Sequence, residues 1–293
     1  MFDTHAHLNF KAFDKDRDKI IQKCLQENIW MINVGTNFFS SEKAVEIANK
    51  YKEGVYASVG LHPINIEVNS KFKNKNSKLP PLPDGQTGKI QNFDKEDVLE
   101  KDFDYQRYKK LAENKKVVAI GEIGLDYYYK PKTKRRLEEF KNKQKEIFLK
   151  QIELAQELNL PIIFHCRMAH QEMIEILKQK IVNSKQKIRG VIHCFTGTCQ
   201  QAEEYSKMGF FLGFNGIIFK LNLDDVIAKT PLDKILIETD CPYLSPPGYK
   251  ERNDPMSLPL IAEKIAQIKS LDSREVLKKT ENNARILFID RNL

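Results

Sequence analysis

Short apolar segments recur along the whole chain, and amphipathic segments separate most of them. Each apolar segment is almost continuously hydrophobic, which is typical of strands buried on both faces of a parallel sheet. Eight segments share this character: 1–7, 29–34, 55–59, 117–121, 161–165, 190–193, 210–213 and 235–238. Because parallel strands that alternate with helices can close on themselves, this order predicts an α/β fold, the (β/α)8 or TIM barrel.

The amphipathic segments carry apolar residues at helical spacing. We predict helices over 14–28 and 132–158, and closing helices within 259–288. The rhythm favours a single domain over 1–293, rather than the two domains that this length also allows. An aperiodic, lysine-containing stretch at 70–94 is predicted to be a surface insertion after the third strand. It is interpreted as a solvated loop, with a substrate-gripping arm as the alternative.

The composition of the chain limits its partners and its compartment. A formal charge of +8 favours an anionic partner such as nucleic acid, although the spread of the lysines also fits an ordinary solvated surface. The five cysteines are odd in number and include no CxxC pair, which argues against a disulfide framework and a structural zinc site. The chain has no signal-peptide pattern and no apolar stretch near the roughly 18 residues of a membrane span, so we expect a cytoplasmic protein without membrane association. A monomer is the default expectation.

Four of the six histidines and two carboxylates lie where predicted strands end. Imidazole and carboxylate are ligands of catalytic divalent ions, and six of them can hold two ions. The candidate metal ligands are His5, His7, Glu122, His165, His193 and Asp240. Because active-site residues of a barrel lie at the carboxyl ends of its strands, these positions are predicted to converge at one rim. Each residue alone could bond to backbone or cap a turn, and it is the joint pattern that favours a metal site.

The predicted ligands divide into two groups that share one carboxylate. Side chains alternate along a strand with a period of two, so His5 and His7 point to the same side. One ion is expected to take His5, His7, Asp240 and Glu122, and the other Glu122, His165 and His193. Two ions about 3.5–4 Å apart can clamp a phosphodiester and lower the pKa of a water. Asp240 and Glu122 are the predicted catalytic residues, with Asp240 orienting or deprotonating that water. Four histidines suit zinc or manganese.

Seven motifs follow one another along the chain. They are Phe2-Asp-Thr-His-Ala-His-Leu, Gly60-Leu-His-Pro, Gly121-Glu-Ile-Gly-Leu-Asp-Tyr-Tyr, Pro161-Ile-Ile-Phe-His-Cys-Arg, His193-Cys-Phe-Thr-Gly, Glu238-Thr-Asp-Cys-Pro-Tyr-Leu and Asn282-Asn-Ala-Arg-Ile-Leu-Phe. Together they resemble the TatD family of metal-dependent deoxyribonucleases, within the amidohydrolase-like barrels. The resemblance covers almost the whole chain except 70–94. It implies a TIM barrel, two divalent ions, and hydrolysis of DNA phosphodiester bonds, often from the 3′ end. It also implies that magnesium can support the activity, and the six candidate ligands match the family's ligand motifs.

Residues beside the ligand motifs are further candidates. His62 is expected to contact the scissile phosphate, with fixing the turn after it as the alternative. Arg167 could hold a phosphate bidentately or form a salt bridge to a neighbouring loop. Tyr127 and its neighbour Tyr128 could stack on bases or cover the barrel rim. Asp126 could orient a ligand histidine.

The stretch from Pro247 departs from the family pattern. The family usually shows Arg-Gly-Lys-x-Asn-x-Pro, whereas this chain reads Pro247-Gly-Tyr-Lys-Glu-Arg-Asn-Asp-Pro. The arginine before the glycine is missing. We name Arg252 and Asn253 as candidate substrate contacts, with Lys250 as an alternative to Arg252.

The leading prediction is a metal-dependent deoxyribonuclease. A D-aminoacyl-tRNA deacylase or another ester hydrolase would use the same metals, so charged tRNA is the alternative substrate. A nucleic-acid-binding protein without catalysis is the second alternative, and the complete ligand set argues against it. Many barrels of the wider superfamily bridge their metals with a carbamylated lysine where Glu122 stands, which weighs against a typical dihydroorotase or phosphotriesterase.

Overall fold

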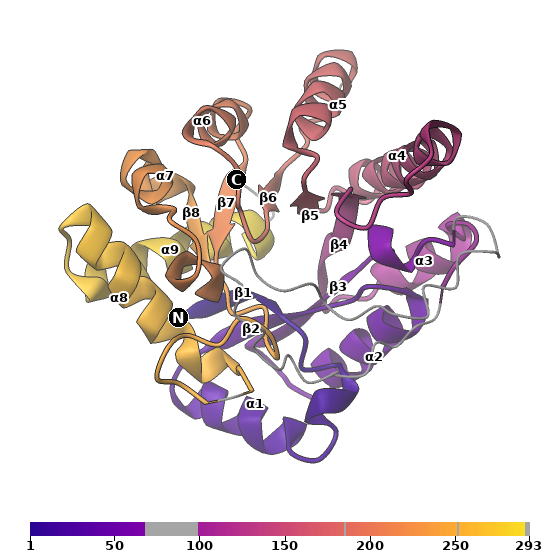
Figure 1. The fold of residues 1–293 in the computed structure, drawn as a ribbon. Coiled ribbons are helices and arrows are strands. Elements are labelled where there is room, and N and C mark those ends of the chain that lie inside the picture. Colours follow the sequence, from indigo (N-terminus) through magenta and orange to yellow (C-terminus); the bar gives the residue numbers. More distant parts are fainter. Residues whose placement is uncertain (68–98, 185, 251, 291–293) are drawn as a thin grey trace.

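The eight predicted strands are present in the computed structural model, which describes residues 1–67, 99–184, 186–250 and 252–290. They form one parallel sheet in which each strand pairs with the next along the chain (Figure 1). The strands are β1 (Phe2–Ala6), β2 (Trp30–Val34), β3 (Val55–Val59), β4 (Val117–Asp126), β5 (Ile162–Arg167), β6 (Gly190–Ile192), β7 (Phe211–Phe214) and β8 (Ile235–Ile237). The predicted insertion at 70–94 lies outside the described residues.

The sheet closes where the first strand meets the end of the last. Ala6 forms a parallel bridge with Cys241, and the Asp240 amide donates to the His5 carbonyl at 2.8 Å. The Thr4 hydroxyl donates to the carbonyl of Ile237 at 3.2 Å. These bonds join the first strand to the segment around the eighth, and the predicted (β/α)8 barrel is confirmed.

Strand β4 is longer than the sequence predicts and ends at Asp126 rather than at 121. Its second half pairs with β5, because the segment from Ile123 to Asp126 lies in register with the segment from Phe164 to Arg167. Glu122 and Asp126 therefore lie on a paired strand and not in a loop after it, which fixes the backbone that carries them.

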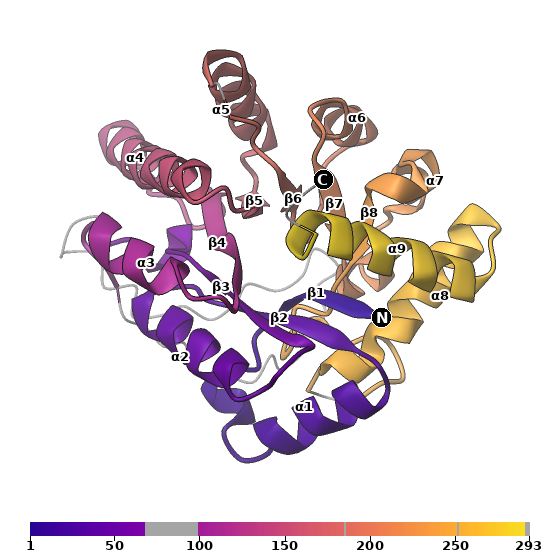
Figure 2. The same cartoon turned by 180° about the vertical axis from the view of Figure 1, so that it is seen from behind.

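Helices surround the sheet on its outer side (Figures 1 and 2). They are α1 (Arg17–Gln26), α2 (Phe38–Asn49), α3 (Tyr105–Ala112), α4 (Lys134–Glu157), α5 (His170–Asn183), α6 (Cys199–Lys207), α7 (Asp224–Lys229), α8 (Leu258–Lys269) and α9 (Ser273–Phe288). Short 3-10 helices are η1 (Lys11–Phe13), η2 (Pro63–Asn65), η3 (Gly216–Phe219), η4 (Leu232–Lys234) and η5 (Pro255–Ser257). The predicted closing region contains α8 and α9, which separate at Ser270, a residue with a left-handed φ of 54°. Within the described part of the chain, no helix combines the length and apolarity needed to cross a membrane.

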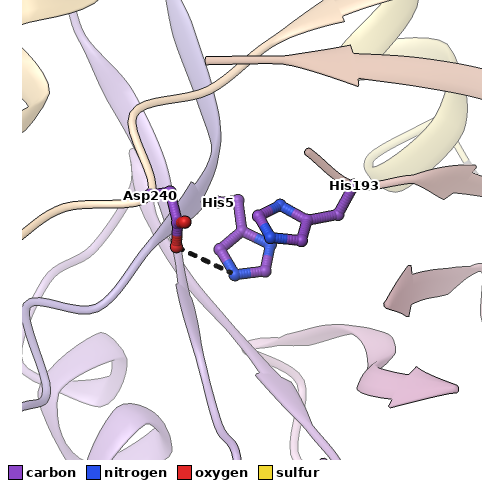
Figure 3. Close-up of side chains that lie close together, drawn as sticks. All are labelled: His5, His193 and Asp240. Atoms are coloured by element: carbon purple, nitrogen blue, oxygen red, sulfur yellow. Dashed lines mark ion pairs between the residues drawn. The ribbon is translucent and has the colours of Figure 1, made fainter. Parts of the chain in front are cut away.

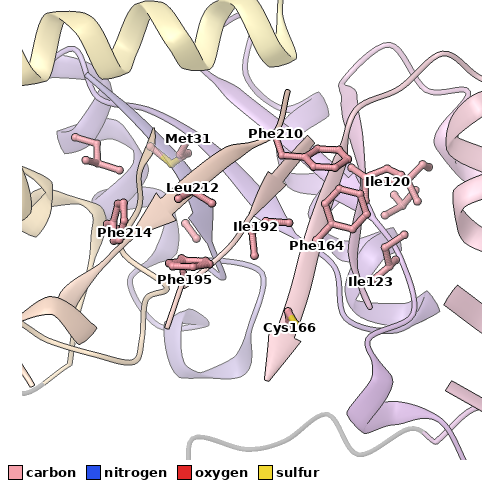
Figure 4. Close-up of a cluster of buried hydrophobic side chains, with 14 of the residues drawn as sticks. Met31, Ile120, Ile123, Phe164, Cys166, Ile192, Phe195, Phe210, Leu212 and Phe214 are labelled. Atoms are coloured by element: carbon pink, nitrogen blue, oxygen red, sulfur yellow. The ribbon is translucent and has the colours of Figure 1, made fainter. Parts of the chain in front are cut away.

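Hydrophobic side chains cover both faces of the strands. The larger cluster packs strand residues such as Phe164 and Leu212 against helix residues such as Ile47, and Figure 4 shows part of it. A smaller cluster joins strand residues including Ile163 to Phe288 of α9, which covers it. Burial of both faces explains why the strands are continuous apolar runs in the sequence.

Candidate metal centre

Three of the predicted ligands meet between β1 and β4. His5 lies in β1, His7 directly follows that strand, and their Nε2 atoms are 3.1 Å apart. His5 Nε2 also lies 3.3 Å from Glu122 Oε2. All three side chains are buried. Ring nitrogens and a carboxylate that face one another at this distance, away from bulk water, form the kind of donor set that binds a divalent metal.

A backbone contact determines which nitrogen of His7 faces the centre. Its Nδ1 lies 2.9 Å from the carbonyl oxygen of Val34 and donates its proton there, which turns Nε2 toward the centre. The Nδ1 atom of His5 is buried and has no hydrogen-bond partner within the described residues. Such unsatisfied polar atoms are rare in protein interiors and are compatible with a site that an ion completes.

Asp240 and His193 also lie beside His5. Asp240 Oδ1 is 3.4 Å from His7 Nε2 and 3.9 Å from His5 Nε2. The ring of His193 stacks on that of His5 with the centroids 3.5 Å apart (Figure 3). One donor atom each from His5, His193 and Asp240 can be chosen so that all three lie within 4.8 Å of one another.

Glu122 also belongs to a second donor group. Its Oε1 atom lies 2.6 Å from His165 Nδ1 and 3.4 Å from His62 Nε2. His62 Nδ1 accepts the N–H of Ile64 at 3.0 Å, which turns Nε2 toward Glu122. The predicted grouping joined His193, not His62, to Glu122 and His165. In the structure His193 Nε2 is 3.6 Å from Glu122 Oε1, so both histidines face this carboxylate.

Two further carboxylates lie behind the histidines. Asp126 Oδ2 is 3.1 Å from His165 Nε2, and Glu238 Oε1 is 2.7 Å from His193 Nδ1. A carboxylate in this position fixes the orientation of a ligand ring and raises its basicity. Asp126 is one of the predicted residues, whereas Glu238 was not predicted. Its available signal was its place at the end of a predicted strand, two residues before Asp240.

The carboxylates at the centre are held in their ionised form. Burial by itself would raise the pKa of Glu122, but the surrounding histidines outweigh it and hold that pKa well below its usual range. Burial likewise opposes ionisation of Asp240, and a hydrogen bond from His7 together with neighbouring histidines lowers its pKa. Both carboxylates therefore offer ionised oxygens to any cation that enters the centre.

The histidines divide according to their carboxylate neighbours. Burial disfavours charge on His165, yet Asp126 and Glu122 raise its pKa to about 9. Glu238 and Glu122 similarly raise the pKa of His193 to about 10 against the effect of burial. Protons on these rings balance the carboxylates, and a divalent ion would displace such protons on binding. The donors and their charges thus fit a divalent metal.

Tyr127 and Tyr128, which the sequence did not distinguish, differ in burial and in their contacts. The Arg167 guanidinium lies over the ring of Tyr128, 3.9 Å from its centroid, and both side chains are partly buried. Tyr127 is only 4% exposed, and the Lys141 ammonium lies 4.4 Å from its ring centroid. A ring buried in this way cannot stack on a base. Tyr127 therefore fits the alternative role of covering the barrel rim, and Tyr128 is the less buried of the two rings.

The loop before η5 also differs from the prediction. The side-chain amide of Asn253 is buried and donates to the carbonyls of Thr239 and Tyr243 at 3.0 and 2.7 Å. Arg252 forms an ion pair with Asp16 and lies over the ring of Phe13 at 4.4 Å. The buried Asn253 amide is satisfied within the protein, which gives it a structural role in place of the predicted substrate contact, and Arg252 is already paired with a carboxylate.

Comparisons with known proteins agree on one family. The family model described as TatD related DNase matches residues 2–289. The chain is 34% identical to the uncharacterized metal-dependent hydrolase YabD of Bacillus subtilis, over 98% of each protein. It is 31% identical to the 3′-5′ ssDNA/RNA exonuclease TatD of Erwinia tasmaniensis, over 98% of this chain and 99% of the relative. The crystal structure of YJJV, a TatD homologue from Escherichia coli, superposes with a TM-score of 0.75 at 26% identity and covers 98% of this chain and 97% of that chain. On this basis the chain belongs to the TatD related DNase family.

Proposed function

We propose that the protein is a metal-dependent deoxyribonuclease that hydrolyses phosphodiester bonds of DNA from the 3′ end. The observation that carries the proposal is the convergence of His5, His7 and Glu122, with Asp240 beside them, at a buried point of the barrel. Relatives named as metal-dependent hydrolases and as a 3′-5′ exonuclease support the choice of reaction.

The proposed site would hold two divalent ions, and Glu122 would contribute to both. His5, His7 and Asp240 would serve one ion, and His165 and His193 the other. The His62 ring accepts a hydrogen bond at Nδ1, so its Nε2–H faces Glu122 as a donor. Magnesium, manganese and zinc are all compatible with these imidazole and carboxylate donors. Ions bound there lower the pKa of a water and offset the negative charge that builds on the phosphoryl oxygens.

The protein's own side chains then position the reactants. Asp240 is ionised and lies at the edge of the centre, so it can orient the attacking water and accept its proton. Arg167 can donate two parallel N–H groups to a phosphate oxygen pair. Asp126 holds the His165 ring in place and thereby positions a ligand rather than the substrate.

We also propose that the protein is a monomer in the cytoplasm and that residues 1–293 form a single domain. In support, all donors of the centre come from one chain. The five cysteines are free, which is typical of a reducing compartment.

The test is nucleotide release from single-stranded DNA that is labelled at the 3′ or the 5′ end. Protein stripped with a chelator receives magnesium, manganese or zinc, and wild type is compared with Glu122→Ala. Glu203→Ala on the exposed face of α6 is the matched control, since it also removes one carboxylate. Metal-dependent release that disappears in Glu122→Ala and persists in Glu203→Ala supports the proposal, and the label pattern gives the polarity. Metal-loaded wild type that releases no nucleotide would refute it, and ester cleavage on charged tRNA would then be measured.

A further inference from the structure

We propose that Arg167 and Tyr128 form a platform on which a base of the substrate stacks beside the metal centre. This inference rests on the proposed function, because it concerns the same substrate. The two side chains are in contact, because the Arg167 guanidinium lies 3.9 Å from the centroid of the Tyr128 ring. Base stacking on aromatic rings and on guanidinium planes is the usual way in which proteins bind unpaired bases.

The charge of Arg167 is not used elsewhere in the described part of the chain. Its guanidinium has no ion pair or hydrogen bond to a described residue, and the contact with Tyr128 is the interaction that holds it. A guanidinium carries five N–H donors in a fixed plane. A partly buried arginine that keeps its donors free beside a metal centre is suited to an anionic ligand, and a phosphate is the group that matches its geometry.

The platform is attached rigidly to the metal centre through Asp126. One oxygen of this carboxylate accepts the Tyr128 backbone N–H at 2.9 Å, and the other lies 3.1 Å from His165 Nε2. Asp126 is also the register partner of Arg167 across β4 and β5. A base on the platform would therefore have a defined place relative to the bond that is cleaved.

The spacing along β5 suits a neighbouring nucleotide. Arg167 follows His165 by two residues on the same strand, so both side chains leave the same face, about 6.6 Å apart along the strand. Tyr129 lies against Tyr128 with the ring centroids 4.9 Å apart and extends the aromatic surface. A phosphate at Arg167 and a base on the adjoining plane would belong to one nucleotide next to the metal centre.

The test compares two fluorescent oligomers that carry the same backbone charge. Both are phosphorothioates, which resist hydrolysis, and one bears bases whereas the other is abasic at every position. Binding to the metal-loaded, full-length protein is measured by anisotropy for wild type, Tyr128→Leu, Tyr128→Phe and Arg167→Lys. Arg189→Lys is the matched control, since it makes the same exchange at an arginine that lies before β6 and bonds to the Asn159 carbonyl. Thermal melting and metal content show whether each variant is folded and loaded.

We expect Tyr128→Leu to weaken binding of the base-bearing oligomer about tenfold and to leave the abasic oligomer unchanged. Tyr128→Phe keeps the ring and should bind like wild type. Arg167→Lys keeps the charge without the planar fork, so it should weaken binding of both oligomers through the lost bidentate phosphate contact, and binding of the base-bearing one more. Equal losses on the two oligomers, or no loss on either, would overturn the platform. Failure of the proposed function would give a different result. Wild type would then release no nucleotide from unmodified DNA, whatever the two oligomers show in the binding measurement.

Discussion

Two histidines near either end of the loop between β5 and α5 have opposite surroundings. His165 lies between the carboxylates of Asp126 and Glu122, which raise its pKa to about 9 although burial opposes charge. His170 begins α5 and packs beside the rings of Phe195 and Tyr205, with centroids 5.2 and 5.9 Å away. Burial, followed by the charge of His165, lowers the pKa of His170 to about 4.

The difference shows what makes a histidine a ligand candidate. Both rings are largely buried, so burial alone does not distinguish them. His165 is on a strand whose neighbour, β4, supplies two carboxylates, whereas His170 is on a helix whose neighbours supply aromatic rings. The presence of carboxylate neighbours, and not of the histidine itself, distinguishes the metal centre from the core around α5.

The largest expected effect comes from removing each histidine in turn. His165→Ala should lower kcat/KM for DNA hydrolysis more than about 100-fold, because loss of a ligand should cost at least as much as loss of a partner behind one. His170→Ala should keep kcat/KM within a few-fold of wild type at a temperature where both are folded. Comparable losses of activity in the two variants would erase the distinction between the two regions.

Metal binding should stabilise the protein, and the two histidine variants should differ in how much of this stabilisation they keep. At a free metal concentration 100 times Kd, binding adds about 2.7 kcal/mol to the free energy of unfolding, and Tm should rise by roughly 4 °C. Differential scanning calorimetry of stripped protein, with and without manganese, measures this rise. His170→Ala should show the same rise as wild type and His165→Ala a smaller one. A rise that is unchanged in His165→Ala would place the bound metal elsewhere.

Asp126→Asn sharpens the comparison by removing the negative charge and keeping the shape. Because Asp126 holds His165 from behind, the metal affinity should fall about 10- to 100-fold. Titration of stripped protein with manganese reports this affinity directly. Asp102→Asn, an exposed carboxylate that pairs with Lys150, is the matched control and should bind metal like wild type. Equal affinities for all three proteins would remove Asp126 from the site.

The smallest expected effect is a pH dependence that originates at His170. Its folded pKa of about 4 lies below the unfolded value of 6.5, so the unfolded chain takes up a proton first as the pH falls. Stability is therefore lost on acidification, by about 2 kcal/mol at pH 5 relative to pH 8. Urea unfolding at both pH values should show that His170→Gln loses less stability on acidification than wild type by this amount. Identical losses would mean that burial does not depress this pKa.

Much of the fold and of the site follows from local patterns. The strand at 55–59 has the predicted bounds, and the other strands are found at the predicted places with shifted ends. The extension of β4 to Asp126 was not predictable, because Gly121 and Gly124 interrupt the apolar run and only pairing with β5 keeps the segment extended. Glu122 was predicted in a loop and lies within a strand for the same reason.

Local sequence determined that eight strands alternate with helices and that imidazoles and carboxylates stand at their carboxyl ends, because periodicity and residue type are properties of the chain itself. Tertiary structure decided which donors face one another. It brought His62 to Glu122, placed Glu238 behind His193, buried Tyr127 and Asn253, and left Arg167 on Tyr128. Spacing along a chain assigns a side chain to an edge of the barrel. Its direction and its partner depend on packing between strands that are distant in sequence.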